Sequence, residues 1–175
     1  MIGVHVHGIF QERGTPSRVR KLRQIFDTPD RYGKDIDWMG YTIHDIVGVL
    51  LLYLETLPEP IVPFDAYESF REVPIGSIDG SNAITVYRDL IRNLHSSNRP
   101  LLLYLLDAAS HFIYSGDING LSTPLMASIL QRAVLHHPDH ESVPAELSIN
   151  QTVLEFLIES IDQFLIGPSP LDDIL

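Results

Sequence analysis

Apolar residues recur along most of the chain at the three- and four-residue spacing of amphipathic helices. Val19, Leu22, Ile25 and Phe26 follow this spacing after Pro16, while the strict alternation of half-buried strands is scarce throughout. The pattern therefore predicts an all-α fold. The expected helices cover approximately residues 16–26, 42–57, 64–73, 84–94, 99–114, 123–135 and 147–166.

Helix-capping residues support several of these boundaries. Thr15 precedes Pro16, which is favourable at the first helical position, and Thr42 with Asp45 has the spacing of a capping box. Asn98 and Ser122 are expected to cap two later helices. The helix before Pro58 is apolar on nearly every side, so it is expected to be central, with its large apolar residues mostly buried. These residues are Ile46, Val49, Leu50, Tyr53 and Leu54.

Length and composition indicate one globular domain. The chain has 175 residues, of which 45% are apolar, and we expect the domain over residues 1–167 with an exposed tail over 168–175. No cysteine is present, which excludes disulfides, thiolate metal sites and cysteine nucleophiles. The apolar run 46–54 is too short to span a bilayer, and no signal peptide pattern is visible. We therefore expect a cytoplasmic protein without membrane insertion.

Charge is distributed unevenly along the chain. The net charge is −11, yet residues 11–34 hold seven of the twelve Lys and Arg against three acids, which makes that segment +4 and the remainder −15. The acidic total argues against general nucleic-acid binding. The helix predicted over 16–26 places Arg18 and Lys21 on a solvent-facing side, where a cationic surface is suited to an acidic patch on a partner protein.

Several motifs in a fixed order resemble those of Rho GTPase-activating (Rho-GAP) domains. These are "GIF" at 8–10, "LPEP" at 57–60, "FDAYESF" at 64–70, "NRPLLLYLLD" at 98–107 and "SGDIN" at 115–119. The stretches 40–71 and "HHPDHE" at 136–141 resemble the fungal branch in particular. The resemblance runs from Val6 to Ile166. It implies a helical bundle that needs no cofactor, binds a GTP-bound Rho-family small GTPase and accelerates GTP hydrolysis mainly through one arginine. Recruitment to a membrane would then occur through the GTPase.

The positions that carry this activity in the family are substituted here. Carrying the motif over residue by residue places the arginine finger at Gln11, two supporting cations at Leu51 and Glu55, and a supporting asparagine at Leu125. A neutral amide does not stabilise phosphoryl charge as a guanidinium does. The resemblance therefore implies a GTPase-binding module whose activating function is impaired. The family's helix before the finger loop is also missing, so we expect exposed apolar surface near residues 1–10 and self-association.

Three other functions are compatible with the residues. Arg13 lies two positions after Gln11 and is a candidate for a displaced finger, because two extended residues move the anchor by about 6 to 7 Å. A scaffold that binds no GTPase is a second alternative. The third is a metal-dependent hydrolase that uses His136 and His140, although Pro138 between them argues against the continuous helix of zinc motifs. We predict no metal site.

Overall fold

The computed structural model describes residues 3–76 and 80–164, and all regular structure within these ranges is helical. The predicted all-α fold is therefore confirmed. The elements are α1 (Pro16–Phe26), α2 (Ile43–Glu55), α3 (Phe64–Arg71), α4 (Gly80–Asn93), α5 (Asn98–Tyr114), α6 (Gly116–Asn119), α7 (Thr123–Val134), the 3₁₀ helix η1 (Pro138–His140), α8 (Pro144–Glu159) and α9 (Ile161–Phe164).

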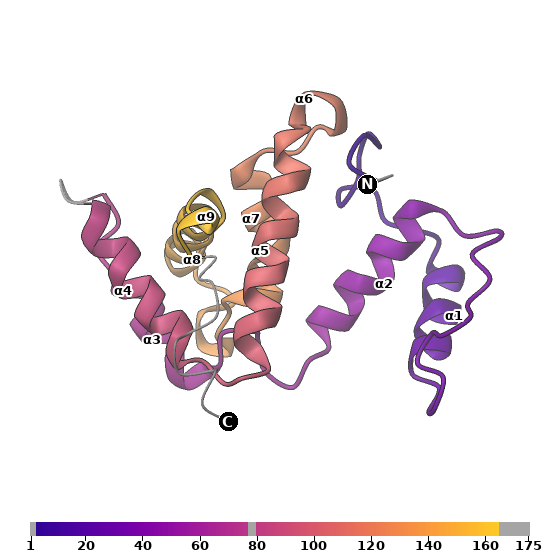
Figure 1. Cartoon of the computed structure of the whole chain (residues 1–175), viewed down its shortest axis with the longest axis horizontal. Helices are drawn as coiled ribbons and strands as arrows, with labels where there is room; N and C mark the ends of the chain where they lie inside the picture. The colour runs from indigo at the N-terminus through magenta and orange to yellow at the C-terminus, as the bar shows by residue number, and fades with distance from the viewer. Residues whose placement is uncertain (1–2, 77–79, 165–175) are drawn as a thin grey trace, which may run out of the picture.

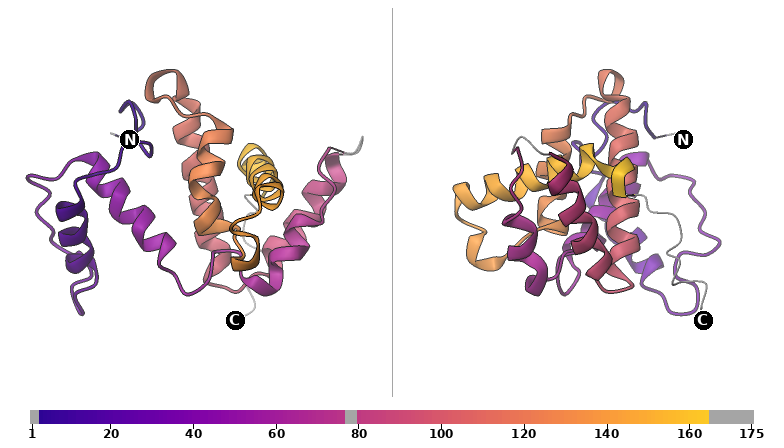
Figure 2. Two further views of the ribbon diagram at one scale, coloured as in Figure 1. Left: turned by 180° about the vertical axis from the view of Figure 1, so that it is seen from behind. Right: turned by 60° about the vertical axis from the view of Figure 1, so that its left-hand side comes forward.

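The helices form three groups along the longest axis of the molecule (Figure 1). α1 and α2 pack together at one end, α3 and α4 at the other, and α5, α7, α8 and α9 lie between them. The view from behind shows the same order, with α7 in front of α5 (Figure 2). The core lies mainly in the middle group. Its fully buried members include Leu102, Leu106, Met126, Leu130, Leu154 and Leu157.

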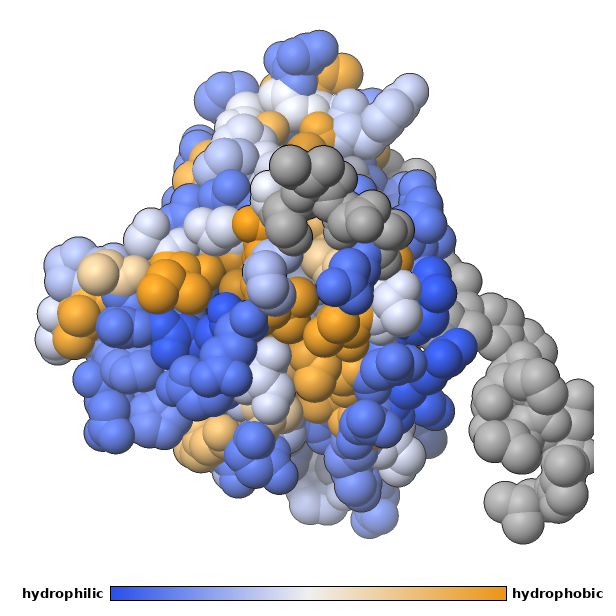
Figure 3. Space-filling model, turned by 90° about the vertical axis from the view of Figure 1, so that its left-hand side faces the viewer, coloured by the Kyte–Doolittle hydropathy of each residue, from blue (hydrophilic) through white to orange (hydrophobic). Residues whose placement is uncertain are grey.

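A second part of the core joins the middle group to α3 and α4. Tyr87 is completely buried, and its hydroxyl donates a hydrogen bond to the backbone oxygen of Phe70 at 2.9 Å. Burial raises the pKa of Tyr87, because the phenolate would lose its hydration. The outer surface of this end is mostly hydrophilic, with hydrophobic residues exposed between the polar ones (Figure 3). Val86 of α4 and Phe64 of α3 are among the exposed hydrophobic residues.

The "LPEP" turn holds the chain against the end of α7. After Pro60, the backbone N–H groups of Ile61 and Val62 donate to the oxygens of Ala133 and Val134, both at 2.9 Å. Ile61 and Val62 are fully buried. The two prolines end α2, and the residues that follow connect it to the middle group.

α2 is less buried than its sequence predicts. Val49 and Leu54 are buried and Ile46 is partly buried, but Leu50 is 40% and Tyr53 is 56% exposed. The prediction was wrong for these two residues because α2 packs against α1 on one side and against α7 on another, which leaves a third face uncovered. Within the described ranges, no helix combines the length and apolar character needed to cross a membrane.

Two other local expectations also need correction. Ser97 takes the N-cap position of α5, and the Asn98 side chain instead donates to the backbone oxygen of Ile61 at 2.8 Å. The helix predicted over 147–166 is interrupted at Ser160, between α8 and α9. Phe164, the last residue of α9, is fully buried, so the core extends to the end of the described chain. The predicted tail, 168–175, lies outside the described residues.

Candidate functional site

The loop from Gly8 to Gly14 begins with a tight turn against the end of α6. Gly8 has a φ of +72° and Phe10 a φ of +65°, a backbone region that non-glycine residues rarely adopt. The N–H of Gly8 donates to the backbone oxygen of Asn119 at 3.0 Å. Phe10 lies edge-on to Phe112 of α5, with ring centroids 5.0 Å apart, and Ile9 is fully buried. Packing on both sides of the turn therefore fixes the strained backbone of Phe10.

Asn119 joins the N-terminal segment to the end of α5 and to the start of the link before α7. Its fully buried side chain donates to the backbone oxygens of Val4 at 2.8 Å and Phe112 at 2.7 Å, and it accepts from the N–H of Leu121 at 2.8 Å. Sequence reasoning noted "SGDIN" only as a motif and missed this role. Gly120, with a φ of +81°, follows Asn119 as a left-handed helix end, which is the signal that marks this corner.

Gln11 projects from the loop beside this corner. The residue is exposed, and its Nε2 donates to the backbone oxygen of Gly120 at 3.3 Å. Its amide is thus held at the α6–α7 junction, a few residues before Leu125 in the first turn of α7. The Ser122 side chain caps α7 by accepting from the N–H of Leu125, as predicted. The structure therefore places the Gln11 side chain against Gly120, in the short link between α6 and α7.

Asp45 fixes the other end of the loop. It is completely buried and accepts hydrogen bonds from the N–H of Thr15 at 2.8 Å and from Arg18 Nε at 2.7 Å. Thr42 donates to the same carboxylate from its N–H at 2.7 Å and from its hydroxyl at 2.9 Å, so the predicted capping box is confirmed. A Cβ on Gly14 would lie 2.5 Å from Asp45 Cα, so only glycine fits where the loop meets α2.

The electrostatics of Asp45 follow from these contacts. Burial alone would raise the pKa of Asp45, but hydrogen bonds from the Thr42 backbone, Arg18, the Thr42 hydroxyl and the Thr15 backbone lower it from 3.8 to about 2. The carboxylate therefore stays ionised at any physiological pH. Thr15 itself starts α1 as predicted, but its side chain makes no capping hydrogen bond.

Arg13 is exposed, and within the described part of the chain it forms no ion pair and no side-chain hydrogen bond. Its neighbour Glu12 contacts His44 of α2, with Oε2 and Nε2 separated by 3.8 Å. The Nδ1 atom of His44 is buried without a hydrogen-bond partner. The middle of the loop is thus only loosely attached to α2, in contrast to its two ends.

The remaining positions carried over from the family lie on α2 and α7, which pack against each other. Leu51 and Leu125 are partly buried and pack against the core. Glu55, one turn after Leu51, is exposed, and it pairs with no cation among the described residues. Arg132, further along α7, forms an ion pair with Glu141 at 3.2 Å. The three carried-over positions on α2 and α7 therefore present two apolar side chains and one exposed acid.

The two cations proposed for a partner surface have different environments. Lys21 is exposed on α1, as predicted. Arg18 is only partly exposed, and its guanidinium is bound to the buried Asp45. Arg18 therefore contributes to the joint between α1 and α2, whereas Lys21 is free to meet a partner.

The structure gives no support to a metal centre at the histidine cluster. The Nδ1 atom of His140 lies 3.0 Å from the Tyr67 hydroxyl, and His136 lies outside η1, with its pKa lowered mainly by burial. His137 is the N-cap of η1 and contacts Phe64 and Tyr67 through its ring. Among the described residues, no group of three or more His, Cys, Asp or Glu is arranged to hold a metal ion.

Comparison with known proteins agrees with this architecture. Residues 1–139 match the family model of the RhoGAP domain. The chain is 38% identical over 161 residues to Rho-GTPase-activating protein 5 of Schizosaccharomyces pombe, covering 91% of this chain and 45% of that protein. It is 36% identical over 156 residues to Rho-GTPase-activating protein BAG7 of Saccharomyces cerevisiae, covering 86% of this chain and 38% of that protein. The chain thus spans less than half the length of these fungal relatives.

Solved structures show the same fold. The BH domain of GRAF, the GTPase regulator associated with focal adhesion kinase, superimposes with a TM-score of 0.80 at 21% identity, covering 95% of this chain and 88% of that one. Human Rho GTPase activating protein 15 superimposes with a TM-score of 0.82 at 21% identity, covering 94% and 77% of the two chains. Because the RhoGAP family model matches residues 1–139 and the two fungal relatives are 36 and 38% identical, this chain belongs to the RhoGAP domain family.

Proposed function

We propose that this chain binds a Rho-family small GTPase in its GTP-bound form and contributes little to GTP hydrolysis. Binding is supported by membership of the RhoGAP family and by relatives that are named as Rho-GTPase-activating proteins. The observation that carries the second part is the exposed amide of Gln11, held against Gly120 in the loop where the family has its arginine finger. A neutral amide supplies none of the positive charge that stabilises phosphoryl transfer.

The surroundings of Gln11 support the same conclusion. The two other positions at which the family has cations hold Leu51, which packs against the core, and Glu55, whose carboxylate is exposed. An acid near a triphosphate raises the energy of the transition state because it repels the developing negative charge. Leu125 offers no amide for positioning a finger. Each substitution thus acts in the direction of weaker activation.

Arg13 supports a second candidate function, an active GTPase-activating protein with a displaced finger. Its guanidinium has no partner within the described chain, and the middle of the loop is only loosely attached, through Glu12 and His44. A reorientation of the loop on binding would bring this cation toward the nucleotide. The buried anchors at Asn119 and Asp45 oppose such a movement, which makes the impaired module the better supported function.

Single-turnover GTP hydrolysis by a Rho-type GTPase, with and without the chain, tests the proposal. The chain is expected to bind the GTP-loaded GTPase in a concentration-dependent way. The rate of GTP hydrolysis should nevertheless stay close to the intrinsic rate of the GTPase. Strong acceleration that disappears in Arg13→Ala would establish the displaced finger instead. Absence of binding to both GTP-loaded and GDP-loaded GTPases would favour the scaffold without a GTPase partner.

The exposed face of α2 bears on the expected self-association. The exposed apolar surface expected near residues 1–10 is not found over residues 3–10, where Ile9 is buried and no large hydrophobic residue is exposed; Met1 and Ile2 lie outside the described residues. Hydrophobic side chains also line a hollow of about 460 Å³ between α1 and α2, among them Phe26, Ile46, Leu50 and Tyr53. We place any self-association at this hollow, because a second chain would remove these side chains from water.

A further inference from the structure

The segment that connects α1 to α2, residues 27–42, carries unusually exposed hydrophobic side chains. Tyr32 is 63%, Trp38 43% and Met39 85% exposed. The Trp38 ring lies 6.4 Å from the ring of Phe26, at the end of α1, so this segment is packed against the helix and does not extend freely into solvent. Joining α1 to α2 does not require three large exposed apolar side chains on the connection.

Cations without an ion-pair partner among the described residues lie next to one of these side chains, Met39. Lys21 of α1 and Arg31 and Lys34 of the connection line one hollow of about 450 Å³ together with Met39. None of the three cations forms an ion pair with a residue in the described ranges. Acidic residues are also found in this part of the chain. One of them, Asp27, forms an ion pair with Arg23 at 3.3 Å.

Two carboxylates, those of Asp35 and Asp37, line the same hollow, and they differ in their hydrogen bonding. The Asp37 side chain accepts from the N–H of Met39 at 2.9 Å, which orients the exposed Met39. Asp35 is exposed. Over residues 18–39, six Lys and Arg stand against four Asp, a net charge of +2 that leaves −13 for the rest of the chain. The charge alone is therefore modest, and the hydrophobic side chains must contribute to any binding.

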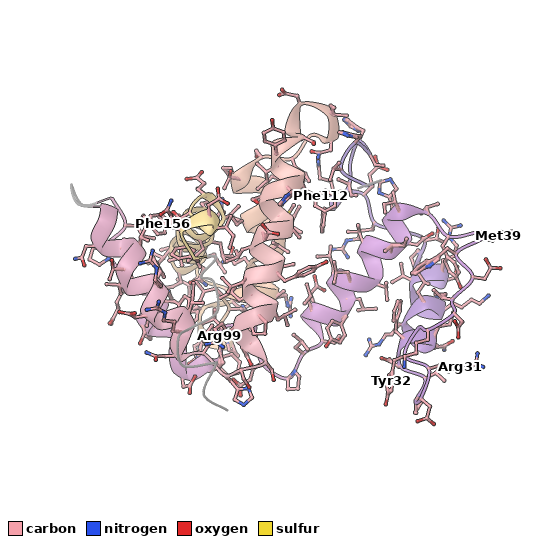
Figure 4. All side chains as sticks on the ribbon, in the orientation of Figure 1. Arg31, Tyr32, Met39, Arg99, Phe112 and Phe156 are labelled. Atoms are coloured by element: carbon pink, nitrogen blue, oxygen red, sulfur yellow. The ribbon has the colours of Figure 1, made fainter. Side chains whose placement is uncertain are left out.

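This surface lies at one end of the molecule. Figure 4 shows Arg31, Tyr32 and Met39 at the end that α1 occupies, with Met39 near the start of α2 and the other two near the end of α1. The connection runs along the outer side of α1, away from α5 (Figures 1 and 2). A surface that meets Arg31, Tyr32 and Met39 at this end can therefore approach without touching the middle group.

We propose that this end of the domain binds an anionic membrane surface. Aromatic rings of Trp and Tyr favour the interface between headgroups and acyl chains, and an exposed Met adds apolar contact below it. Lys21, Arg31 and Lys34 lie beside the anionic headgroups, which attract them. The strongly acidic remainder of the chain is repelled by the same surface, so the molecule is oriented with α1 toward the bilayer. The contact is peripheral and requires no spanning helix.

The proposal is independent of GTPase binding, and the chain provides its own probe. Trp38 is the only tryptophan in the sequence, so tryptophan fluorescence reports on this connection alone. The chain is mixed, without any GTPase, with vesicles of phosphatidylcholine or of phosphatidylcholine with phosphatidylserine. With the anionic vesicles we expect co-sedimentation and a blue shift of Trp38 emission, both weakening as salt rises. Phosphatidylcholine alone is expected to give neither.

Matched variants locate the contact. Lys21→Glu with Lys34→Glu should weaken co-sedimentation with anionic vesicles by about tenfold or more, and Met39→Asp should weaken it while leaving the fold intact because Met39 is highly exposed. Arg92→Glu with Arg132→Glu changes the net charge equally on other helices and should bind as the wild type does. Circular dichroism of each variant checks that it is folded.

Several outcomes would overturn the proposal. One is binding to inositol hexakisphosphate or to polyglutamate, without vesicle binding or a Trp38 shift, which would identify a site for soluble anions or for acidic proteins. Another is equal loss of vesicle binding in the Arg92/Arg132 control, which would show that only the net charge matters. Co-sedimentation with anionic vesicles that leaves Trp38 emission unchanged would place the contact elsewhere on the chain.

Discussion

The guanidinium of Arg18 and the carboxylate of Asp45 meet at 2.7 Å, and this contact joins α1 to the start of α2. Asp45 is completely buried, and it also accepts from the backbone N–H of Thr15 at the end of the finger loop. A single buried acid thus connects the first helix, the loop and the second helix. Its protonation or removal should loosen all three together.

Asp45 should make the stability of the domain sensitive to acid. Its pKa is about 2 in the folded chain and 3.8 ordinarily, so the unfolded chain binds the proton more readily and stability is lost as pH falls. The stabilisation is fully present above about pH 4 and should decrease by about 2 kcal/mol as pH approaches 2. Urea unfolding of the wild type and Asp45→Asn across this range measures it.

Asp45→Asn should be less stable than the wild type at neutral pH, by about 2 to 4 kcal/mol, because it leaves the Arg18 guanidinium without its charged partner. It should also lack the part of the acid dependence that Asp45 causes. Asp89→Asn is the control, since Asp89 is an exposed acid on α4 that pairs with Arg92 at 3.4 Å. An unchanged acid dependence in Asp45→Asn would mean that other carboxylates cause it.

Local features of the fold could be predicted from the sequence, whereas its long-range contacts could not. The capping box of Thr42 and Asp45 and the start of α1 at Pro16 depend on neighbours within a turn, and both follow from residue type. That the same Asp45 also accepts from Arg18 depends on how two helices pack, which periodicity does not specify. The hydrogen bond from the Asn119 side chain to Val4 joins residues that are even further apart, because 115 positions separate them in the sequence.

The exposure of Leu50 and Tyr53 shows the same limit. A helix that is apolar on all sides indicates burial on all sides, but exposure depends on which neighbours cover each side. Family resemblance pointed to Gln11 and to Leu125 of α7, positions that periodicity does not single out; in the structure the Gln11 side chain donates to Gly120, three residues before α7 begins. The prediction that Arg18 faces solvent and a partner protein was less accurate, because its guanidinium forms an ion pair with the buried Asp45.

Lys21 and Arg18 should respond differently to charge reversal. Lys21→Glu should leave stability nearly unchanged and slow association with an acidic GTPase surface by about two- to fivefold at low salt, because exposed charges act mainly on encounter. Arg18→Glu should instead lower the free energy of unfolding, since it places an acid beside the buried Asp45. Stopped-flow association over a salt series and urea unfolding separate the two effects.

Self-association should depend on the uncovered face of α2. Leu50→Asp places a charge in the hollow between α1 and α2, so any concentration-dependent dimer seen by sedimentation equilibrium should dissociate. Val86→Asp makes the same change at an exposed apolar position on α4 and should leave the dimer intact. A wild-type chain that stays monomeric at high concentration would show that this face does not associate with itself.

If the proposed impairment is correct, Gln11→Arg should make the chain accelerate GTP hydrolysis more than the wild type does. The substitution places a cation on a loop whose ends are fixed by Asn119 and Asp45, where a guanidinium would stabilise the charge on the phosphoryl oxygens of GTP bound to the GTPase. An intact finger contributes roughly 10³ to 10⁵ in rate. We expect a smaller gain here, because Leu51 and Glu55 still lack positive charge beside it.

The double variant Gln11→Arg with Glu55→Arg tests that reasoning. Removing the exposed acid of α2 and adding a cation should raise the rate above that of Gln11→Arg alone, because both changes lower the negative potential near the nucleotide. Gln11→Ala is the matched control, which should bind the GTPase and leave its rate of GTP hydrolysis the same as the wild-type chain does. Single-turnover rates at saturating chain separate binding from catalysis. If Gln11→Ala were to abolish a strong wild-type activity, the glutamine itself would be catalytic, and the assignment of an impaired finger would be wrong.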